Sequence, residues 1–199
     1  MRVLVLCSGT GSIDRAIERR GWEVTSVDWL AKFGPTLCMD ITEWDYRAAF
    51  PKDHFQFVWA SPACTHFSLA RTTGGPRDLE GATALLARCL GIADYFGCEW
   101  CLENPATGLL RRQPLMQGLA WRDTCYCKYS FEYRNTRGCG TRAPSGNRSG
   151  LSPSVGVSGS KGNHRQTKGT MGTIGTRSIL HLFLGFLQQP HFSIFDDNF

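Results

Sequence analysis

Two side chains that stand just after apolar runs have the types needed for nucleophilic chemistry. Cys64 follows the run 55–60 (FQFVWA) and lies among polar and turn-forming residues in SPACTHFSLAR. Glu103 follows the run 98–102 and lies in LENP. If these runs are neighbouring parallel strands, their carboxyl ends meet at the edge where open α/β sheets place their chemistry. A thiolate and a carboxylic acid would then face the same substrate.

A thiolate beside a carboxylic acid suits substitution at C5 of cytosine. This carbon is a poor nucleophile until another group adds to C6, and a cysteine can supply that addition. An acid that protonates or hydrogen-bonds N3 stabilises the charge that develops. We therefore predict Cys64 as the nucleophile and Glu103 as the acid. The alternative for Glu103 is a carboxylate that only stabilises the N-terminus of a following helix.

The sequence neighbours of the two candidates support the same site. Pro62 stiffens the approach to the thiol. His66 and Arg71 lie near enough in sequence to favour the thiolate. Asn104 is expected to fix the loop that follows the second run. The predicted substrate-binding residues in these two segments are Ser61, Pro62 and Asn104.

A glycine-rich turn near the N-terminus predicts a second site, for a nucleoside cofactor. CSGTGS follows the apolar run 2–7 and opens a helical pattern, so Gly9 and Gly11 would let the backbone approach a ligand. The turn is incomplete as a dinucleotide fingerprint, because Asp14 stands in place of the third glycine.

Polar and aromatic residues at the next strand ends complete this cofactor site. Asp28 could accept both ribose hydroxyls of an adenosine, and Trp29 could stack on the adenine. Asp40 could take the exocyclic amine. The alternative is that these aspartates only cap helices, as strand-end aspartates often do. The predicted cofactor-binding residues are Cys7, Gly9, Gly11, Asp28, Trp29 and Asp40.

Apolar periodicity along the first two-thirds of the chain alternates between strand and helix. The longest helical pattern covers 79–96, where apolar residues recur at spacings of three and four. Strands that alternate with helices predict an α/β fold, a mostly parallel sheet with helices on both faces. The predicted strands are 2–7, 23–27, 55–60, 98–102 and 124–129, and the predicted helices are 12–20 and 79–96.

The composition favours a globular intracellular protein. Apolar residues make up 42% of the 199 residues, which excludes a disordered chain, and no apolar stretch approaches the length of a membrane helix. The N-terminus lacks the cleavage site of a signal peptide. We expect no membrane partner, and a location in the nucleus if the source is eukaryotic, otherwise in the cytoplasm or in the cytoplasm of a phage-infected host.

The nine cysteines are expected to be mostly free, buried thiols in a reducing compartment. Cys98 and Cys101 together with Cys125 and Cys127 could be imagined as a four-thiolate zinc site. Alternation along a strand would send the first pair to opposite faces, which makes a poor chelate. We therefore predict core cysteines and no metal.

The last third of the chain differs in character. The formal net charge is +5, but the acidic and basic residues of 1–134 balance, so the whole excess lies in 135–199. Residues 135–195 contain no Asp or Glu and are rich in Gly, Ser, Thr and Arg. We predict two parts: a catalytic domain over 1–134 and a disordered or out-of-frame tail over 135–199.

Four segments, in the same order, resemble motifs of the C5-cytosine-specific DNA methyltransferase family. They are LCSGTGSIDRAIERRGWEVTSVDW, SPACTHFS, LENP and YSFEYRNTR, and the resemblance covers roughly residues 3–137. The cysteine loop also reads on into RTTGGPRDLEGA, which is similar to compact phage-type and algal members. The resemblance implies a Rossmann-like S-adenosylmethionine-dependent methyltransferase fold.

The resemblance also implies roles for individual residues. Cys64 would be the nucleophile and Glu103 the carboxylate on the cytosine edge. Arg137 would match the last arginine of the family's Q-x-R-x-R segment, and Arg134 would serve beside it in the substrate site, because Tyr133 and Asn135 replace the usual Gln and first Arg. The expected partners are S-adenosylmethionine and a cytosine flipped out of DNA, with RNA as a variant because some members methylate tRNA. We expect a monomer.

Departures from the family pattern leave alternatives open. The usual Pro-Pro-Cys reads Pro62-Ala63-Cys64 here, and the usual Glu-Asn-Val reads Glu103-Asn104-Pro105, both of which are tolerable changes. No target-recognition domain or final motif is evident. A truncated fold that does not turn over, or a methyltransferase with another acceptor, are therefore the alternatives.

A slip of reading frame would explain the unusual tail. Similar proteins continue the arginine segment into a strand such as TRLWTN, whereas this chain reads TRGCGT over 136–141. Back-translation from the third base of the Arg137 codon permits Arg-Leu-Trp-Asn. Our hypothesis is that the frame slips near residues 135–137, so that the last strands of the sheet are missing. A nucleotide sequence with no family-like alternative frame downstream would refute it.

Overall fold

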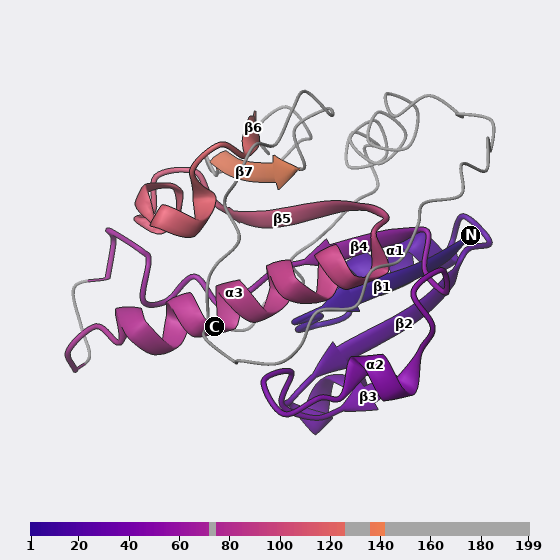
Figure 1. Cartoon of the computed structure of the whole chain (residues 1–199). Helices are drawn as coiled ribbons and strands as arrows, with labels where there is room; N and C mark the ends of the chain where they lie inside the picture. Colours follow the sequence, from indigo (N-terminus) through magenta and orange to yellow (C-terminus); the bar gives the residue numbers. More distant parts are fainter. Residues whose placement is uncertain (72–74, 126–135, 142–199) are drawn as a thin grey trace, which may run out of the picture.

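The computed structural model describes residues 1–71, 75–125 and 136–141. Within them, one sheet has the strand order β3-β2-β1-β4-β5-β7-β6 (Figure 1). The strands are β1 (Arg2–Leu6), β2 (Glu23–Asp28), β3 (Leu37–Cys38), β4 (Phe57–Ala60), β5 (Glu99–Pro105), β6 (Ala120–Cys125) and β7 (Thr136–Thr141). The helices are α1 (Ser12–Glu18), α2 (Tyr46–Ala49) and α3 (Leu79–Phe96), with 3-10 turns η1 (Ala31–Phe33), η2 (Leu110–Arg112) and η3 (Pro114–Met116).

The strands β1 to β5 are parallel, and the central ones are buried on both faces, as their continuous apolar sequences require. β4 is buried along its whole length. Leu6 of β1 is level with Val27 of β2 and Ala60 of β4, and Ala60 is in turn level with Leu102 of β5. This register brings the carboxyl ends of four strands to one edge of the sheet.

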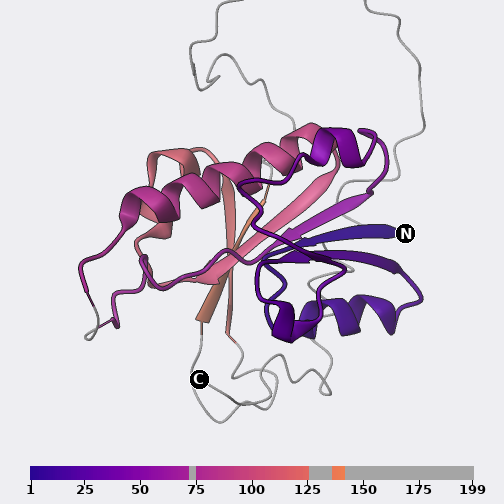
Figure 2. The ribbon, with the colours of Figure 1, turned by 90° about the horizontal axis from the view of Figure 1, so that it is seen from below.

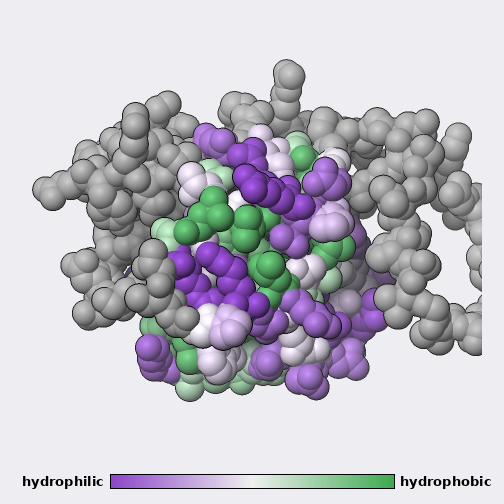
Figure 3. Space-filling model, turned by 90° about the vertical axis from the view of Figure 1, so that its left-hand side faces the viewer, coloured by the Kyte–Doolittle hydropathy of each residue, from purple (hydrophilic) through white to green (hydrophobic). Residues whose placement is uncertain are grey.

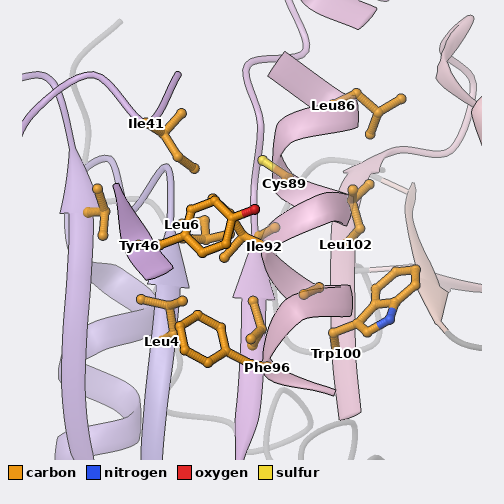
Figure 4. Close-up of a cluster of buried hydrophobic side chains, with 14 of the residues drawn as sticks. Leu4, Leu6, Ile41, Tyr46, Leu86, Cys89, Ile92, Phe96, Trp100 and Leu102 are labelled. Atoms are coloured by element: carbon orange, nitrogen blue, oxygen red, sulfur yellow. The ribbon is translucent and has the colours of Figure 1, made fainter. Parts of the chain in front are cut away.

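The long helix α3 covers one face of the sheet. The side chain of Asp78 accepts a hydrogen bond from the backbone N–H of Gly81 (2.8 Å) at its start, and Gly97 ends it in a left-handed conformation (φ 65°). Burial of each leucine stabilises the fold by roughly 1.5–3 kcal/mol, so this apolar face holds α3 firmly on the sheet. The packed side chains labelled in Figure 4 include Leu86, Cys89 and Ile92 of α3, Tyr46 of α2, Leu4 and Leu6 of β1, and Leu102 of β5.

The helix α1 covers the opposite face, as Figure 2 shows. Its apolar side chains Ile13, Ala16 and Ile17 pack against Val3, Val5 and Phe57 of β1 and β4. Helices on both faces of a mostly parallel sheet confirm the predicted fold class. In the described part of the chain, no helix is long and apolar enough to cross a membrane.

The far side of the sheet is more complete than the sequence led us to expect. Residues 136–141 form β7, which lies between β5 and β6 and is antiparallel to both. The expectation that the last strands are missing is therefore wrong at this position. The strand forms although TRGCGT has no apolar alternation, because a central strand is held by backbone ladders on both sides. The strand expected at 124–129 overlaps β6 at residues 124–125, and residues 126–129 lie outside the described residues.

Candidate active site

Four strand ends form the edge at which the candidate residues gather. The ladder continues just beyond β1 and β4, where the N–H of Ser8 donates to the carbonyl of Val27 (3.3 Å) and that of Ser61 to Leu6 (3.0 Å). The turns after β1, β2 and β4 therefore start close to the same level, and β5 continues past that level to Pro105. Figure 3 views this edge, on which hydrophilic and apolar groups lie side by side.

The loop after β4 holds Cys64 in a single turn. The carbonyl of Cys64 accepts hydrogen bonds from the backbone N–H groups of Phe67 (3.0 Å) and Ser68 (2.8 Å). The side chain of Phe67 is fully buried in the core beneath α3 and anchors this turn. Cys64 is a half-buried free thiol, so it is held in place and still accessible.

Two hydrogen bonds tie this loop to the end of β5. The side-chain amide of Asn104 donates to the carbonyl of Pro62 (2.8 Å), and the N–H of Leu109 donates to the carbonyl of Phe67 (2.7 Å). A Cβ at Gly108 would lie only 3.2 Å from the Phe67 carbonyl oxygen, so the two segments approach as closely as a glycine allows. The predicted proximity of the cysteine loop and the Glu-Asn turn is confirmed.

Alternation along β4 and β5 assigns the site residues to faces. Trp59 and Cys101 pack on the α1 side, so Ser61 and Glu103, two residues further along each strand, face that side as well. The indole N–H of Trp59 donates to the hydroxyl of Ser61 (2.8 Å). Ser61 and Glu103 therefore project from adjacent strand ends on the same face, and Glu103 is half-buried there.

Asn104 projects to the other face and is buried (2% exposed). Its amide nitrogen donates to the Pro62 carbonyl, and its Oδ1 atom is buried with no hydrogen-bond partner among the described residues. This geometry makes Asn104 a positioning residue for the cysteine loop. Its direct contact with a substrate remains a prediction.

The turn after β1 has the backbone conformation that a close ligand approach requires. Cys7, Gly9 and Gly11 all have positive φ angles (56°, 54° and 71°), of which only the glycines adopt such values without strain. No atom lies within 4 Å of a Cβ built on Gly9, so the space above it is open. The side chain of Cys7 is hydrogen-bonded to Cys89 of α3, and this bond together with burial raises the pKa of the Cys89 thiol.

Asp28 closes this turn from the end of β2. Its carboxylate accepts the backbone N–H of Gly9 through Oδ2 and that of Leu30 through Oδ1, both at 2.9 Å. Each oxygen keeps a second lone pair that a ligand hydroxyl can use. Asp28 is buried, whereas the adjacent Trp29 is 72% exposed. An aromatic ring so exposed beside a buried acid fits a stacking platform for a base.

Asp40 follows β3 at the same edge. The N–H of Met39 donates to the carbonyl of Asp28 (2.9 Å), which holds the segment beside β2. The carboxylate of Asp40 accepts from both the N–H and the hydroxyl of Thr42 (2.8 Å each), and these bonds lower the pKa of Asp40. Asp40 is thus an exposed, ionised acceptor.

One acidic residue beneath the turn has a property that the sequence did not indicate. Burial raises the pKa of Asp14, in the first turn of α1, to about 6, although a hydrogen bond with Ser26 of β2 acts in the opposite direction. Ser26 in turn exchanges hydrogen bonds with Thr36, before β3. The only signal in the sequence was that Asp14 occupies the place of the third glycine.

The structure describes the position of one of the two predicted arginines. Arg137 lies on β7, where its backbone is level with Pro105 of β5 and Thr124 of β6, so this strand runs directly beside the Glu-Asn turn. Arg134 lies outside the described residues. Among the residues that the structure describes, no group of three potential metal ligands is present.

Comparison with known proteins relates this arrangement to methyltransferases. No protein-family model matches the chain. The chain is 37% identical over 124 residues to a "Probable DNA (cytosine-5)-methyltransferase" of Frog virus 3 (isolate Goorha). The match covers 56% of each protein, so the chain spans a little over half the length of that relative.

Two solved structures share the fold. The S. pombe Dnmt2 methyltransferase superposes with a TM-score of 0.50 and 15% identity, over 74% of this chain and 53% of that one. The Entamoeba histolytica methyltransferase EhMeth gives 0.51 and 11%, over 76% and 56%. The fold is therefore that of a methyltransferase. The sequence relative confirms the more specific resemblance to the C5-cytosine methyltransferases.

Proposed function

We propose that this chain transfers a methyl group from S-adenosylmethionine to C5 of cytosine in DNA, through a covalent adduct on Cys64. The observation that carries the proposal is the tie between two loops. Asn104 and Leu109 hold the cysteine loop against the end of β5, so Cys64 and Glu103 start from adjacent strands at one edge. The sequence relative, whose printed name is that of a DNA (cytosine-5)-methyltransferase, supports the same reaction.

The residues at the ends of β1, β2 and β3 suit S-adenosylmethionine. Gly9 has open space where a side chain would stand, and Asp28 keeps free lone pairs for ribose hydroxyls. Trp29 offers an exposed ring for the adenine, and Asp40 an ionised acceptor for its amine. When bound, the cofactor supplies an electrophilic methyl group on a sulfonium.

The chain's own residues prepare the base. The thiolate of Cys64 forms a bond to C6, while Glu103 gives a proton to N3, so that the electron pair of the C5–C6 bond becomes available at C5. C5 then takes the methyl group, and the electron pair of the broken methyl–sulfur bond stays on the departing thioether. A base from solvent takes the C5 proton, the Cys64 thiolate departs and the C5–C6 double bond is restored, while N3 returns its proton to Glu103. The substrate base must leave the duplex for this attack.

Covalent trapping tests the proposal. The protein is incubated with S-adenosylmethionine and a duplex that contains 5-fluorocytosine, in which fluorine replaces the proton that must leave. We expect a denaturation-resistant adduct that maps to Cys64 by mass spectrometry and that is lost in Cys64→Ala. Cys38→Ala is the matched control, because Cys38 is also a free thiol and is more exposed. It should trap as the wild type does.

The outcomes separate the alternatives. An adduct with 5-fluorocytosine RNA but not with DNA would show that the substrate is RNA. Cofactor binding by calorimetry without any adduct would indicate a methyltransferase fold that does not turn over. Full methylation by Cys64→Ser would refute the covalent route and favour another acceptor.

A further inference from the structure

The imidazole of His66 lies between the cysteine loop and the start of α3. Its Nδ1 atom is 2.8 Å from the backbone N–H of Asp78, the residue that caps α3. The guanidinium of Arg71 approaches the same nitrogen at 3.3 Å. A backbone N–H and a guanidinium can only donate, so Nδ1 must carry its lone pair and the ring must be neutral, with its proton on Nε2.

The cysteine loop is thereby held on two sides. Asn104 ties it to β5 through the Pro62 carbonyl, before the cysteine, and His66 ties it to α3 after the cysteine. Arg77, just before the capping residue, adds to the second tie by donating to the carbonyls of His66 (3.1 Å) and Ser68 (2.6 Å). Cys64 lies in the single turn between these attachments.

We propose that His66 is a positioning residue that fixes the turn carrying Cys64 by accepting the Asp78 N–H as a neutral Nε2-protonated imidazole. The sequence placed His66 near the thiol as a group that favours the thiolate. In the structure its Nδ1 accepts the backbone N–H of Asp78. Its expected effect on the reaction rests on the proposed function, whereas its effect on the loop does not.

Three substitutions separate the hydrogen bond from the bulk of the side chain. In His66→Asn, the amide oxygen stands one bond from Cγ, where Nδ1 does, and can accept the Asp78 N–H. In His66→Gln, the matched control, the same amide is displaced by one methylene to the place of Nε2. His66→Ala removes the acceptor altogether. The wild type and the three variants are compared by hydrogen exchange of the Asp78 amide.

We expect exchange at Asp78 to be about tenfold faster in His66→Ala and His66→Gln, and close to wild type in His66→Asn, because one hydrogen bond is lost and then restored. Alkylation of Cys64 by iodoacetamide, measured against Cys38 in the same sample, should accelerate in the same two variants. Adduct formation with the 5-fluorocytosine duplex should slow in them, and His66→Asn should rescue it. Exchange in the middle of α3 serves as the measure of global folding.

The proposal is overturned if His66→Ala leaves Asp78 exchange unchanged, or if all three substitutions act alike. It is also overturned if exchange rises while Cys64 alkylation stays at the wild-type rate. If no variant, the wild type included, forms an adduct, the proposed function fails. The exchange and alkylation pattern then still decides whether His66 holds the loop.

Discussion

The two halves of the proposed site are held in different ways. The cysteine half is tied across the fold, by Asn104 to β5 and by His66 to α3. The cofactor half is held by Asp28, whose carboxylate binds the glycine turn, and it leaves the ring of Trp29 exposed to solvent. A nucleophile that must reach one carbon atom needs a fixed position, because small displacements cost large factors in rate. A cofactor that enters and leaves needs an open platform.

The largest expected effect is that of Asp28→Ala, which alters the cofactor half. In Asp28→Ala the backbone N–H groups of Gly9 and Leu30 lose their acceptor, and orphaned donors cost about 1–3 kcal/mol each. We expect a loss of about 3 kcal/mol in the free energy of unfolding, measured with urea. Cofactor affinity should fall by more than about tenfold by calorimetry.

The cysteine half should not respond to Asp28→Ala beyond this loss of stability. Alkylation of Cys64 is the control, measured under conditions in which the variant is folded. A large change in that rate would show that the two halves are not held independently.

Asn104→Ala is the matching change in the cysteine half. It leaves the buried carbonyl of Pro62 without its donor, so we expect a loss of about 2 kcal/mol in the free energy of unfolding. Adduct formation should slow by about 100-fold because the loop loses its tie to β5. Cofactor affinity should stay within about twofold of wild type. An equal loss of affinity and adduct rate would contradict the division into two halves.

Local sequence patterns located some strands of the sheet and not others. Apolar runs that end in polar residues located β1, β2, β4 and β5, and the register of parallel strands then gathered their ends. The strand β3 has two residues, too few for any pattern. β7 lacks apolar alternation because it contains Gly138 and Gly140, and its pairing depends on β5 and β6.

Side-chain directions were beyond the sequence. The sequence named Cys7 as cofactor-binding but could not show that its thiol is hydrogen-bonded to Cys89, which lies far along the chain on α3. Likewise the sequence named His66 as a group near the thiol but could not show that its Nδ1 accepts the backbone N–H of Asp78. Such partners are set by packing between elements, which no local spacing encodes.

Asp14, beneath the glycine turn of the cofactor half, should make the free energy of unfolding depend on pH. Its pKa is raised from 3.8 to about 6 in the folded protein, so the folded state holds more protons than the unfolded state between these values. Its contribution to stability is therefore full below pH 3.8 and is lost as pH rises through about 6. Asp14→Asn should raise the free energy of unfolding by about 1–2 kcal/mol at pH 7.

The advantage of Asp14→Asn should shrink as urea unfolding is repeated at lower pH, towards pH 4. Glu43→Gln, an exposed change outside α1, is the control and should alter stability by less than about 0.5 kcal/mol at any pH. An advantage that is independent of pH would show that the buried charge of Asp14 is not its cause.

Trp29→Ala has the smallest expected effect, because it should change cofactor binding in the cofactor half without changing stability. Its ring is 72% exposed, so Trp29→Ala should leave the urea midpoint and the alkylation rate of Cys64 unchanged. If the ring stacks on the adenine, removal should weaken cofactor binding by about tenfold, since such aromatic contacts contribute about 0.5–1.5 kcal/mol. Trp29→Phe, which keeps a ring, should recover most of the affinity. Unchanged affinity in Trp29→Ala would show that the adenine does not stack on this ring. The cofactor half would then have to bind its cofactor through the glycine turn and Asp28 alone.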